Sequence, residues 1–586
     1  MSSERPAVNQ ITTDVLVLGA GGAGLFAALH AKKTNPDLDV TIAVKGLLGK
    51  CGCTRMVQGG YNVALAPGDS IERHFMDTIE GGAWLNQQDL AWLLVSTAPV
   101  RIRELETELG CFFDRNADGT VHQKAFAGQT FDRTVHKGDL TGIEIINRLA
   151  EQVWRREVRR LEDHRALDFI AAADGSGLAG VLMLDMRSGE PLLVHARATL
   201  LATGGGPTMY KYHTPSGDKS CDGMAMALRA GLPLRDMEMV QFHPTGLLAG
   251  AGTRMTGTVL EEGLRGSGGY LTDSAGERFM FGYDKRGERA TRDIVSRSIM
   301  DRIRGGFSSP HGGVFIEMGH LGPDNVRREF KGMVERCADC GFDLAAGRVE
   351  VIPTAHYMMG GVVFSSDCTT PLNGLYAAGE DTGGVHGANR LGGNGVANST
   401  VFGGLAGDAI AARTSPRGVL ANPDRHALEA ALARLEAPFA KPRGDLEGIR
   451  RRLYEVMWTE VGILRTAAGL GRGQAALDDL AREIAVAGVA AGERRYNLTW
   501  MDRLNLENLV LVSRIICAAA IARTDSRGAH FREDFPTASE LATSHYTLAW
   551  LIGEAPRIDT APVDFTRVKP GESLIGQTAL SFSRFR

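Results

Sequence analysis

Six residues with charged or hydrogen-bonding side chains lie in glycine-rich or irregular segments of the sequence. They are His243, Glu262, Arg265, Arg292, His356 and Arg390. Arginine can hold a carboxylate through two parallel hydrogen bonds, and histidine can donate a further one at neutral pH. For any one of these residues alone, a packing or surface role is the commoner explanation. Together, in loops flanked by glycines, they favour a binding site for a small dianion.

The segment that must anchor such a site lies near the N-terminus, over residues 14–25. It predicts a buried parallel strand, a Gly-x-Gly-x-x-Gly turn at Gly19, Gly21 and Gly24, and then a helix. The first glycine permits a tight turn, the second lets a pyrophosphate approach the backbone, and the third permits close packing of helix on strand. The helix start offers free N–H groups to phosphates. A strand before and a helix after make this a predicted dinucleotide site.

Two later segments repeat this succession of strand and glycines. Residues 198–206 form a predicted strand that runs into three glycines, and residues 374–380 form another, after which a glycine-rich stretch opens a helix that reaches about Ala412. Three such approaches suggest one large dinucleotide lying across a single domain. The second strand, over 38–45, ends in Lys45 rather than in an acidic residue, which departs from the usual NAD pattern.

The rest of the chain predicts several domains, because 586 residues are too many for one core. Helical spacing of apolar residues occurs over 70–109, 143–158 and much of 423–522, whereas glycine and charge alternate between about 247 and 350. We therefore expect an α/β fold: a Rossmann-like domain with an inserted α+β capping domain and a C-terminal helical domain. The expected boundaries are 1–246 and 351–415 for the dinucleotide-binding domain, 247–350 for the capping domain, 423–545 for the helical domain and 546–586 for a tail.

Composition excludes several classes of function. A net charge of −4 argues against a nucleic-acid or anionic-membrane surface as the main binding surface. We expect no membrane-spanning run and no signal peptide, hence a cytoplasmic protein whose membrane association comes through a partner. The eight cysteines include no iron–sulfur ligand run, and we expect neither a disulfide framework nor a metal site. Electrons leaving this chain singly would pass to another subunit or to some soluble acceptor.

Several longer motifs identify a family. Gln241-Phe-His-Pro-Thr-Gly, Glu262-Gly-Leu-Arg-Gly, Arg292-Asp, His356-Tyr-Met-Met-Gly-Gly and His386-Gly-Ala-Asn-Arg-Leu-Gly-Gly-Asn resemble segments of the flavoprotein subunit of succinate dehydrogenase and fumarate reductase. L-aspartate oxidase belongs to the same superfamily. The resemblance covers nearly the whole chain, because it also includes segments at 461–466 and 526–534. Motifs of this length in this order are highly specific.

The resemblance implies FAD as the cofactor and a C4 dicarboxylate as the substrate. Forming a C=C bond from an unactivated CH–CH also favours flavin over nicotinamide as the hydride acceptor. The implied FAD contacts are Gly19, Gly21, Gly22, Gly24, Lys45, Cys53, Thr54, Gln58, Gly59, Gly60, Asp222, Glu380, Gly395 and Val396. By the same resemblance, the two substrate carboxylates would be held by His243, His356 and Arg390. Arg292 would be the proton donor or acceptor, and Glu262 and Arg265 would relay that proton to solvent.

The sequence departs from this family at two positions. Respiratory members attach FAD covalently to a histidine, and the matching residue is Cys53. We predict non-covalent FAD, with a thioether to Cys53 as the alternative. Without the covalent link, which raises the flavin potential, the enzyme should lean toward fumarate reduction or an easier donor. The family's substrate-contacting threonine is replaced by Glu261, which either points away from the dianion or signals a different substrate; Thr256 or Thr258 could take its role.

Three hypotheses follow. The first is the flavoprotein subunit of a succinate dehydrogenase or fumarate reductase complex. It would pass electrons to an iron–sulfur subunit, which together with a membrane anchor would hold it peripherally on the cytoplasmic face of the inner membrane. The second is a free-standing oxidase of the L-aspartate oxidase type. The third, a flavin-binding scaffold without catalysis, is disfavoured because His243, Arg292, His356 and Arg390 are all present.

Overall fold

A computed structural model of the chain describes residues 8–250, 252–489 and 492–575. The start of the chain, on which the expectation of no signal peptide rests, and the end of the expected tail lie outside these ranges. The seven-stranded central sheet has the order β6-β2-β1-β9-β8-β7, with β16 paired to the C-terminal end of β9. Its strands are β1 (Asn9–Leu18), β2 (Val40–Val44), β6 (Val158–Glu162), β7 (His164–Ala171), β8 (Leu178–Asp185), β9 (Glu190–Leu201) and β16 (Leu375–Ala377).

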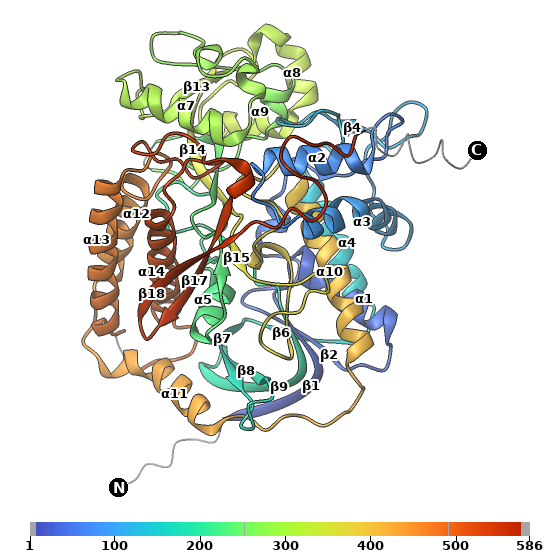
Figure 1. Ribbon diagram of the computed structural model, residues 1–586, viewed down its shortest axis with the longest axis vertical. Coiled ribbons are helices and arrows are strands. Elements are labelled where there is room, and N and C mark those ends of the chain that lie inside the picture. The colour runs from blue at the N-terminus through green and yellow to red at the C-terminus, as the bar shows by residue number, and fades with distance from the viewer. Residues whose placement is uncertain (1–7, 251, 490–491, 576–586) are drawn as a thin grey trace.

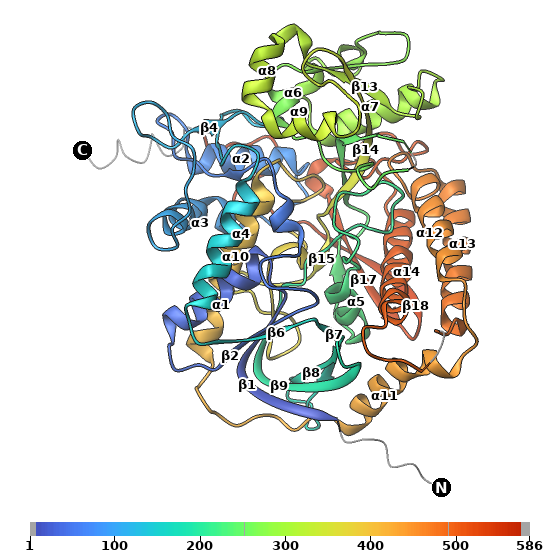
Figure 2. The same ribbon diagram turned by 180° about the vertical axis from the view of Figure 1, so that it is seen from behind.

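Two helices that are distant in sequence pack closely beside this sheet. They are α1 (Gly22–Thr34) and α10 (Asn394–Arg413), which run side by side in Figures 1 and 2. Their backbones approach because α10 carries glycines four residues apart: a Cβ at Gly403 would lie 2.5 Å from the carbonyl oxygen of Ala23, and one at Gly407 only 2.3 Å from that of Ala27. This packing brings the N-terminal ends of both helices to one region, as the repeated strand–glycine pattern predicted.

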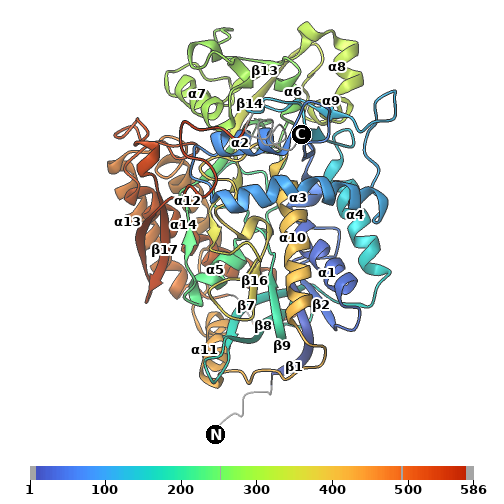
Figure 3. The same ribbon diagram turned by 45° about the vertical axis from the view of Figure 1, so that its right-hand side comes forward.

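Helices and a small sheet cover the side of the dinucleotide-binding domain that carries α1 and α10. The helices α2 (Ile71–Gly81), α3 (Gln88–Thr107) and α4 (Thr141–Trp154) lie there, with α3 crossing α10 in Figure 3. The predicted helical stretch 70–109 is thus two helices, separated by Ala83 and Trp84, both with positive φ. The small sheet consists of β3 (Tyr61–Asn62), β4 (Gln123–Lys124) and β5 (Thr134–Val135).

The inserted segment forms a separate layer, at the top of Figure 1, with its own apolar core. Its four-stranded antiparallel sheet has the order β11-β14-β13-β12. The sheet is formed by β11 (Val240–Leu247), β12 (Tyr270–Thr272), β13 (Val314–Glu317) and β14 (Arg348–Met358), and its helices are α6 (Gly263–Gly266), α7 (Arg292–Arg304), α8 (Pro323–Glu329) and α9 (Lys331–Ala338). The sheet begins before residue 247 and ends after residue 350, because the long strands β11 and β14 connect the insert to the rest of the chain.

A helical layer packs on the opposite side of the central sheet, together with a C-terminal hairpin. Its helices are α5 (Asp222–Arg229), α11 (Arg425–Glu436), α12 (Leu446–Thr459), α13 (Ala467–Val486) and α14 (Leu498–Ala522). The hairpin of β17 (His545–Ile552) and β18 (Ala555–Pro562) joins the short strands β10 (Leu234–Arg235) and β15 (Gly361–Val362) in one sheet. The C-terminal hairpin is therefore hydrogen-bonded to strands of the dinucleotide-binding domain.

Helix α14 is long and strongly apolar. Within the described residues it meets the length and composition requirements for crossing a membrane, with a mean hydropathy of 1.6, which was not expected from the sequence. However, 78% of its apolar window is buried inside the protein, chiefly against α13, with α12, α5 and the strands of the C-terminal hairpin also packed on it. This burial is typical of a core helix rather than of a membrane span.

Candidate active site

One cavity of about 540 Å³ extends from the start of α1 to the base of the inserted layer. Nearly every residue predicted to contact cofactor or substrate lines it. Gly24 and Arg265 are the exceptions, since both lie behind the wall. A Cβ at Gly24 would be 2.0 Å from the carbonyl oxygen of Gly19, so this glycine permits close packing of helix on strand rather than ligand contact. The structure therefore brings together residues that the sequence spreads over nearly 400 positions.

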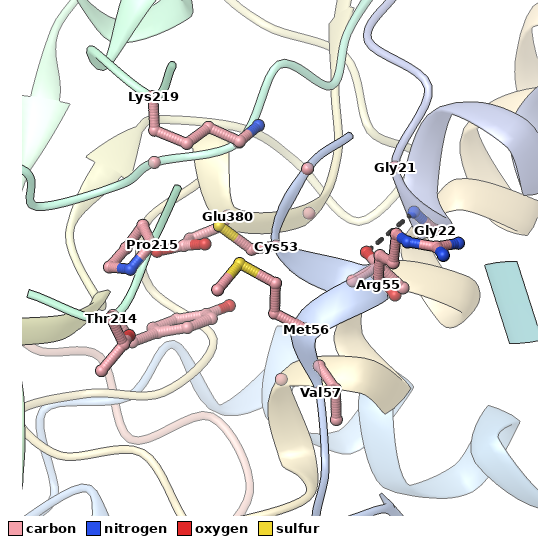
Figure 4. A pocket seen from close by; sticks show the side chains of 18 of the residues that line it. Gly21, Gly22, Cys53, Arg55, Met56, Val57, Thr214, Pro215, Lys219 and Glu380 are labelled. Carbon is pink, nitrogen blue, oxygen red and sulfur yellow. Dashed lines mark hydrogen bonds between the residues drawn. The ribbon is translucent and has the colours of Figure 1, made fainter. Parts of the chain in front are cut away.

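The two helix starts form the polar end of the cavity. Neither Gly21 before α1 nor Gly393 before α10 provides a side-chain cap, and neither helix has an acidic residue in its first turn. The backbone N–H of Gly22 donates to Oγ1 of Thr54 at 3.0 Å (Figure 4). Uncapped N-termini that face one cavity are suited to phosphate groups. These observations fit the pyrophosphate and the long shape of a flavin dinucleotide.

Lys45, at the end of the second strand, is held by its own neighbours. Its Nζ donates to Asp222 Oδ2 at 2.9 Å and to Asn505 Oδ1 at 3.0 Å, and Asp222 also pairs with Arg165 at 2.7 Å. Burial lowers the pKa of Lys45 to about 8, although Asp222 opposes that shift. Asp222, from the first turn of α5, thus places a carboxylate beside the end of β2. The acidic group that the strand itself lacks comes from elsewhere in the chain.

Cys53 and Glu380 lie in the wall of the cavity, as Figure 4 shows. Burial raises the pKa of the Cys53 thiol to about 12, so the thiolate form is scarce at neutral pH. Burial also raises the pKa of Glu380 to about 7, while its carboxylate accepts a hydrogen bond from the backbone N–H of Met358 at 3.0 Å. The eight cysteines are all free thiols.

The two predicted substrate histidines face each other from paired strands. His243 on β11 and His356 on β14 have ring centroids 5.4 Å apart. Nδ1 of His243 accepts from the backbone N–H of Thr245 at 3.3 Å, which leaves Nε2 to carry the proton and donate. Burial, reinforced by the positive charge of Arg292, lowers the pKa of both histidines well below the usual value. They are therefore neutral hydrogen-bonding groups.

Beside the histidines, Glu262 joins the two arginines of the inserted layer. Arg292, the first residue of α7, donates to Glu262 Oε2 from Nε at 3.1 Å and from Nη2 at 2.5 Å. Arg265 donates to the other oxygen at 3.4 Å and to the carbonyl of Glu288 at 2.7 Å. Burial alone would raise the pKa of Glu262, but the two guanidiniums hold it below its usual value. The three side chains form a continuous ionic chain leading away from the cavity.

Gln241 completes this arrangement, although it was not among the site residues predicted from the sequence. Its Oε1 accepts from Arg292 Nη1 at 3.0 Å and from Arg390 Nη2 at 3.1 Å. Arg390 also lies over the ring of Tyr357, with its guanidinium carbon 4.4 Å from the centroid. Two guanidiniums are thus held side by side by one neutral acceptor. In the sequence, the feature that could have identified Gln241 as a site residue is its place at the start of the Gln-Phe-His-Pro-Thr-Gly motif.

The charge at this end of the cavity suits a dianion. The guanidiniums of Arg265, Arg292 and Arg390 stand against the single carboxylate of Glu262, which leaves two positive charges. The second carboxylate, Glu261, is neutralised by Lys124 of β4, whose Nζ lies 3.1 Å from Oε2. Of the two candidate threonines, Thr258 lines the cavity but donates to the carbonyl of Met255, and Thr256 donates to that of Gly250.

Comparisons with known proteins place most of the chain in described families. A family model for the FAD binding domain matches residues 14–396, and one for the fumarate reductase flavoprotein C-terminal region matches residues 450–574. A fumarate reductase (CoM/CoB) chain of Methanothermobacter marburgensis is 39% identical over 529 residues, which cover 89% of this chain and 94% of that protein.

Two further relatives extend the comparison. The 8-methylmenaquinol:fumarate reductase flavoprotein subunit of Wolinella succinogenes is 34% identical, and the match covers 89% of this chain and 86% of that protein. A solved structure of a mutated FrdA chain from the quinol fumarate reductase of Escherichia coli superposes with a TM-score of 0.90 at 31% identity, over 96% of this chain and 99% of that chain. The fold expected from the sequence, a Rossmann-like FAD-binding domain with an insert and a C-terminal helical region, is confirmed.

Proposed function

Because the chain belongs to the fumarate reductase and succinate dehydrogenase flavoprotein family, we propose that it is an FAD-dependent oxidoreductase that interconverts fumarate and succinate. The observation that carries this proposal is the pair of guanidiniums, Arg292 and Arg390, held side by side beside two neutral histidines. Two surplus positive charges match the two carboxylates of a C4 dicarboxylate.

The residues divide the work of binding and proton transfer. His243, His356 and Arg390 bind the two carboxylates and fix the substrate in one orientation, which lowers the entropic cost of reaching the transition state. Bound FAD would supply hydride transfer to or from one carbon of the substrate. Arg292 gives a proton to the other carbon in the reductive direction, or takes it in the oxidative direction. Glu262 and then Arg265 return or remove that proton along the ionic chain.

FAD would be held without a covalent bond. The uncapped starts of α1 and α10, the glycines Gly21 and Gly22 and the Glu380 carboxyl group support FAD binding in the cavity. Covalent attachment at Cys53 would need a nucleophilic sulfur, and the raised pKa of this thiol disfavours one.

Electron exchange would use a partner protein. We propose an iron–sulfur subunit that is itself attached to a membrane anchor on the cytoplasmic face of the inner membrane, which would make this chain a peripheral subunit. The relatives carry different donors in their names, CoM/CoB in one and 8-methylmenaquinol in the other, so the donor is a property of the assembly and not of the flavoprotein fold. Purification from native membranes tests this part: an iron–sulfur protein should co-purify, and a chain recovered alone from the soluble fraction would contradict it.

A substrate panel tests the reaction itself. We expect the purified flavoprotein to oxidise a reduced artificial dye with fumarate and to reduce an oxidised dye with succinate. L-aspartate should give neither dye reduction nor peroxide formation under oxygen. Turnover with L-aspartate but not with fumarate or succinate would replace the proposal by the L-aspartate oxidase alternative.

A further inference from the structure

A lysine outside the dianion site lies in the wall of the same cavity. Lys219 belongs to the loop between β9 and α5, and its side chain extends toward the cavity near Cys53 and Glu380 (Figure 4). Its Nζ donates to the carbonyl oxygen of Thr203 at 2.8 Å. A Cβ at Gly204 would lie 3.4 Å from this nitrogen and one at Gly52 would lie 4.0 Å away. The ammonium group therefore sits between the loop after β9 and the loop that carries Cys53.

The ammonium group of Lys219 makes no direct ion pair within the described part of the chain. Among the residues that the structure describes, no carboxylate lies within 4.0 Å of its Nζ, and the Thr203 carbonyl is its one hydrogen-bond acceptor. Lys45, the other lysine among the residues that line the cavity, pairs with Asp222. The accessible part of Lys219 faces the cavity. A ligand that fills the cavity would therefore enclose this ammonium in a medium where charge interactions are much stronger than in water.

The position of Lys219 in the cavity indicates which part of a bound ligand its charge would contact. The phosphate-binding helix starts are already suited to anions without it, and the dianion site has its own two surplus charges. Cys53 occupies the position at which family members attach the flavin ring, so the neighbouring ammonium belongs to the flavin end of the cofactor site. A positive charge beside a flavin stabilises the reduced form, which carries more negative charge, over the oxidised form.

We propose that Lys219 tunes the bound flavin: its ammonium group raises the reduction potential of FAD. The positive charge thereby replaces part of the increase in potential that the covalent link gives in respiratory relatives. This inference rests on the FAD site of the proposed function and not on the identity of the dicarboxylate. The lysine stays cationic: burial lowers its pKa, but acidic groups around it, Asp218 and Glu380 among them, raise the pKa above its usual value.

The test is an anaerobic titration of the bound flavin against a reference dye, without substrate, in the full-length holoprotein. We expect Lys219→Met to lower the ratio of reduced to oxidised flavin at a fixed potential by about tenfold, which is about 30 mV for a two-electron couple. Lys219→Arg, which keeps the charge, should restore most of the difference. Lys50→Met, which removes an exposed lysine three residues before Cys53 but outside the cavity, should leave the potential unchanged.

The outcome is decisive even if the variant binds flavin weakly. In that case the affinities for oxidised and reduced FAD are measured separately, and the proposal predicts that reduced FAD loses about tenfold more affinity than oxidised FAD. Equal losses, an unchanged potential in Lys219→Met, or a drop in Lys219→Arg as large as in Lys219→Met would overturn it. Because no substrate enters this measurement, a failure to turn over fumarate would be a separate result.

Discussion

The side-chain oxygen of Gln241 lies 3.0 Å from Nη1 of Arg292, and the same oxygen accepts a second hydrogen bond from Arg390. An acidic residue in this place would cancel one of the charges that a dianion needs. An apolar one would leave two buried guanidiniums facing each other without a shared acceptor. A neutral amide oxygen keeps them adjacent and charged.

Replacing Gln241 by leucine should therefore damage substrate use without releasing the cofactor. Loss of a hydrogen bond to a charged group costs about 1.5–3 kcal/mol, so we expect kcat/KM for fumarate to fall by roughly 10- to 100-fold. FAD content, measured by absorbance, should stay unchanged. Gln87→Leu is the matched control, since Gln87 makes a similar contact with Arg235 at 3.2 Å away from the cavity. Equal effects of the two variants on kcat/KM would show that Gln241 has no specific role in the substrate site.

The pair of Lys124 and Glu261 explains the residue that departs from the family pattern. It joins the small sheet of the FAD-binding domain to the inserted layer, and both side chains are largely buried. Breaking a buried pair costs about 3 kcal/mol or more, so Lys124→Glu should lower the unfolding temperature and raise the KM for fumarate. The double variant Lys124→Glu, Glu261→Lys should recover much of both.

A surface pair provides the control for this exchange. Lys137 pairs with Asp114 at 3.1 Å and is largely exposed, so Lys137→Glu should change neither quantity much. If the double variant of Lys124 and Glu261 were no better than Lys124→Glu alone, the ion pair would not be the reason for Glu261.

The two substrate histidines predict a simple pH dependence. Burial first, and Arg292 next, lower the pKa of His243 and His356 well below the usual value near 6.5, so both stay neutral as the pH falls from 8 to 6. We therefore expect neither histidine to contribute an inflection to the pH-rate profile of kcat/KM for fumarate in this window; an inflection near pH 7 would come from Glu380, whose pKa is about 7, and would persist in His356→Gln. A decline centred near pH 6.5 that disappears in His356→Gln would show that a histidine titrates there.

The state of Cys53 predicts how FAD leaves the protein. A thiol with a pKa of about 12 is almost wholly protonated at pH 7 and is a weak nucleophile. Cold acid precipitation should therefore leave all the flavin in the supernatant, and Cys53→Ser should retain FAD equally well before precipitation. Flavin that stays with the pellet of the unaltered protein, but not with that of Cys53→Ser, would establish a thioether instead.

Local patterns in the sequence were sufficient for the FAD-binding fold. A backbone segment that approaches a phosphate needs glycines between a strand and a helix. This local pattern is visible in the sequence at Gly19 and Gly21, and again in the glycine-rich stretch before α10. The sequence also predicted that the segment containing α10 belongs to the same domain as α1. The direct packing of the two helices, which Gly403 and Gly407 permit, is seen only in the structure.

Contacts between distant segments were not predictable in the same way. The sheet that joins β10 and β15 to the C-terminal hairpin depends on strands of two residues, which have no periodic signal. Gln241 gains its role from Arg292 and Arg390, which are 51 and 149 residues away. Glu261 gains its partner from Lys124, 137 residues away, and Lys219 gains its role from the distant loop that carries Cys53. A lone lysine in a loop carries no sign in the sequence that its charge will lack a partner.

The most direct test of the central claim, that Arg292 protonates a dicarboxylate beside bound flavin, is a single-turnover measurement. The holoprotein is reduced anaerobically and mixed with fumarate while flavin absorbance is followed, so that no partner protein is needed. We expect fumarate to reoxidise the flavin with formation of one succinate per FAD, and Arg292→Ala to slow this step by roughly 10²- to 10⁴-fold with FAD still bound. If fumarate did not reoxidise the reduced flavin, or if reoxidation were equally fast in the unaltered protein and in Arg292→Ala, the proposed role of Arg292 would be contradicted.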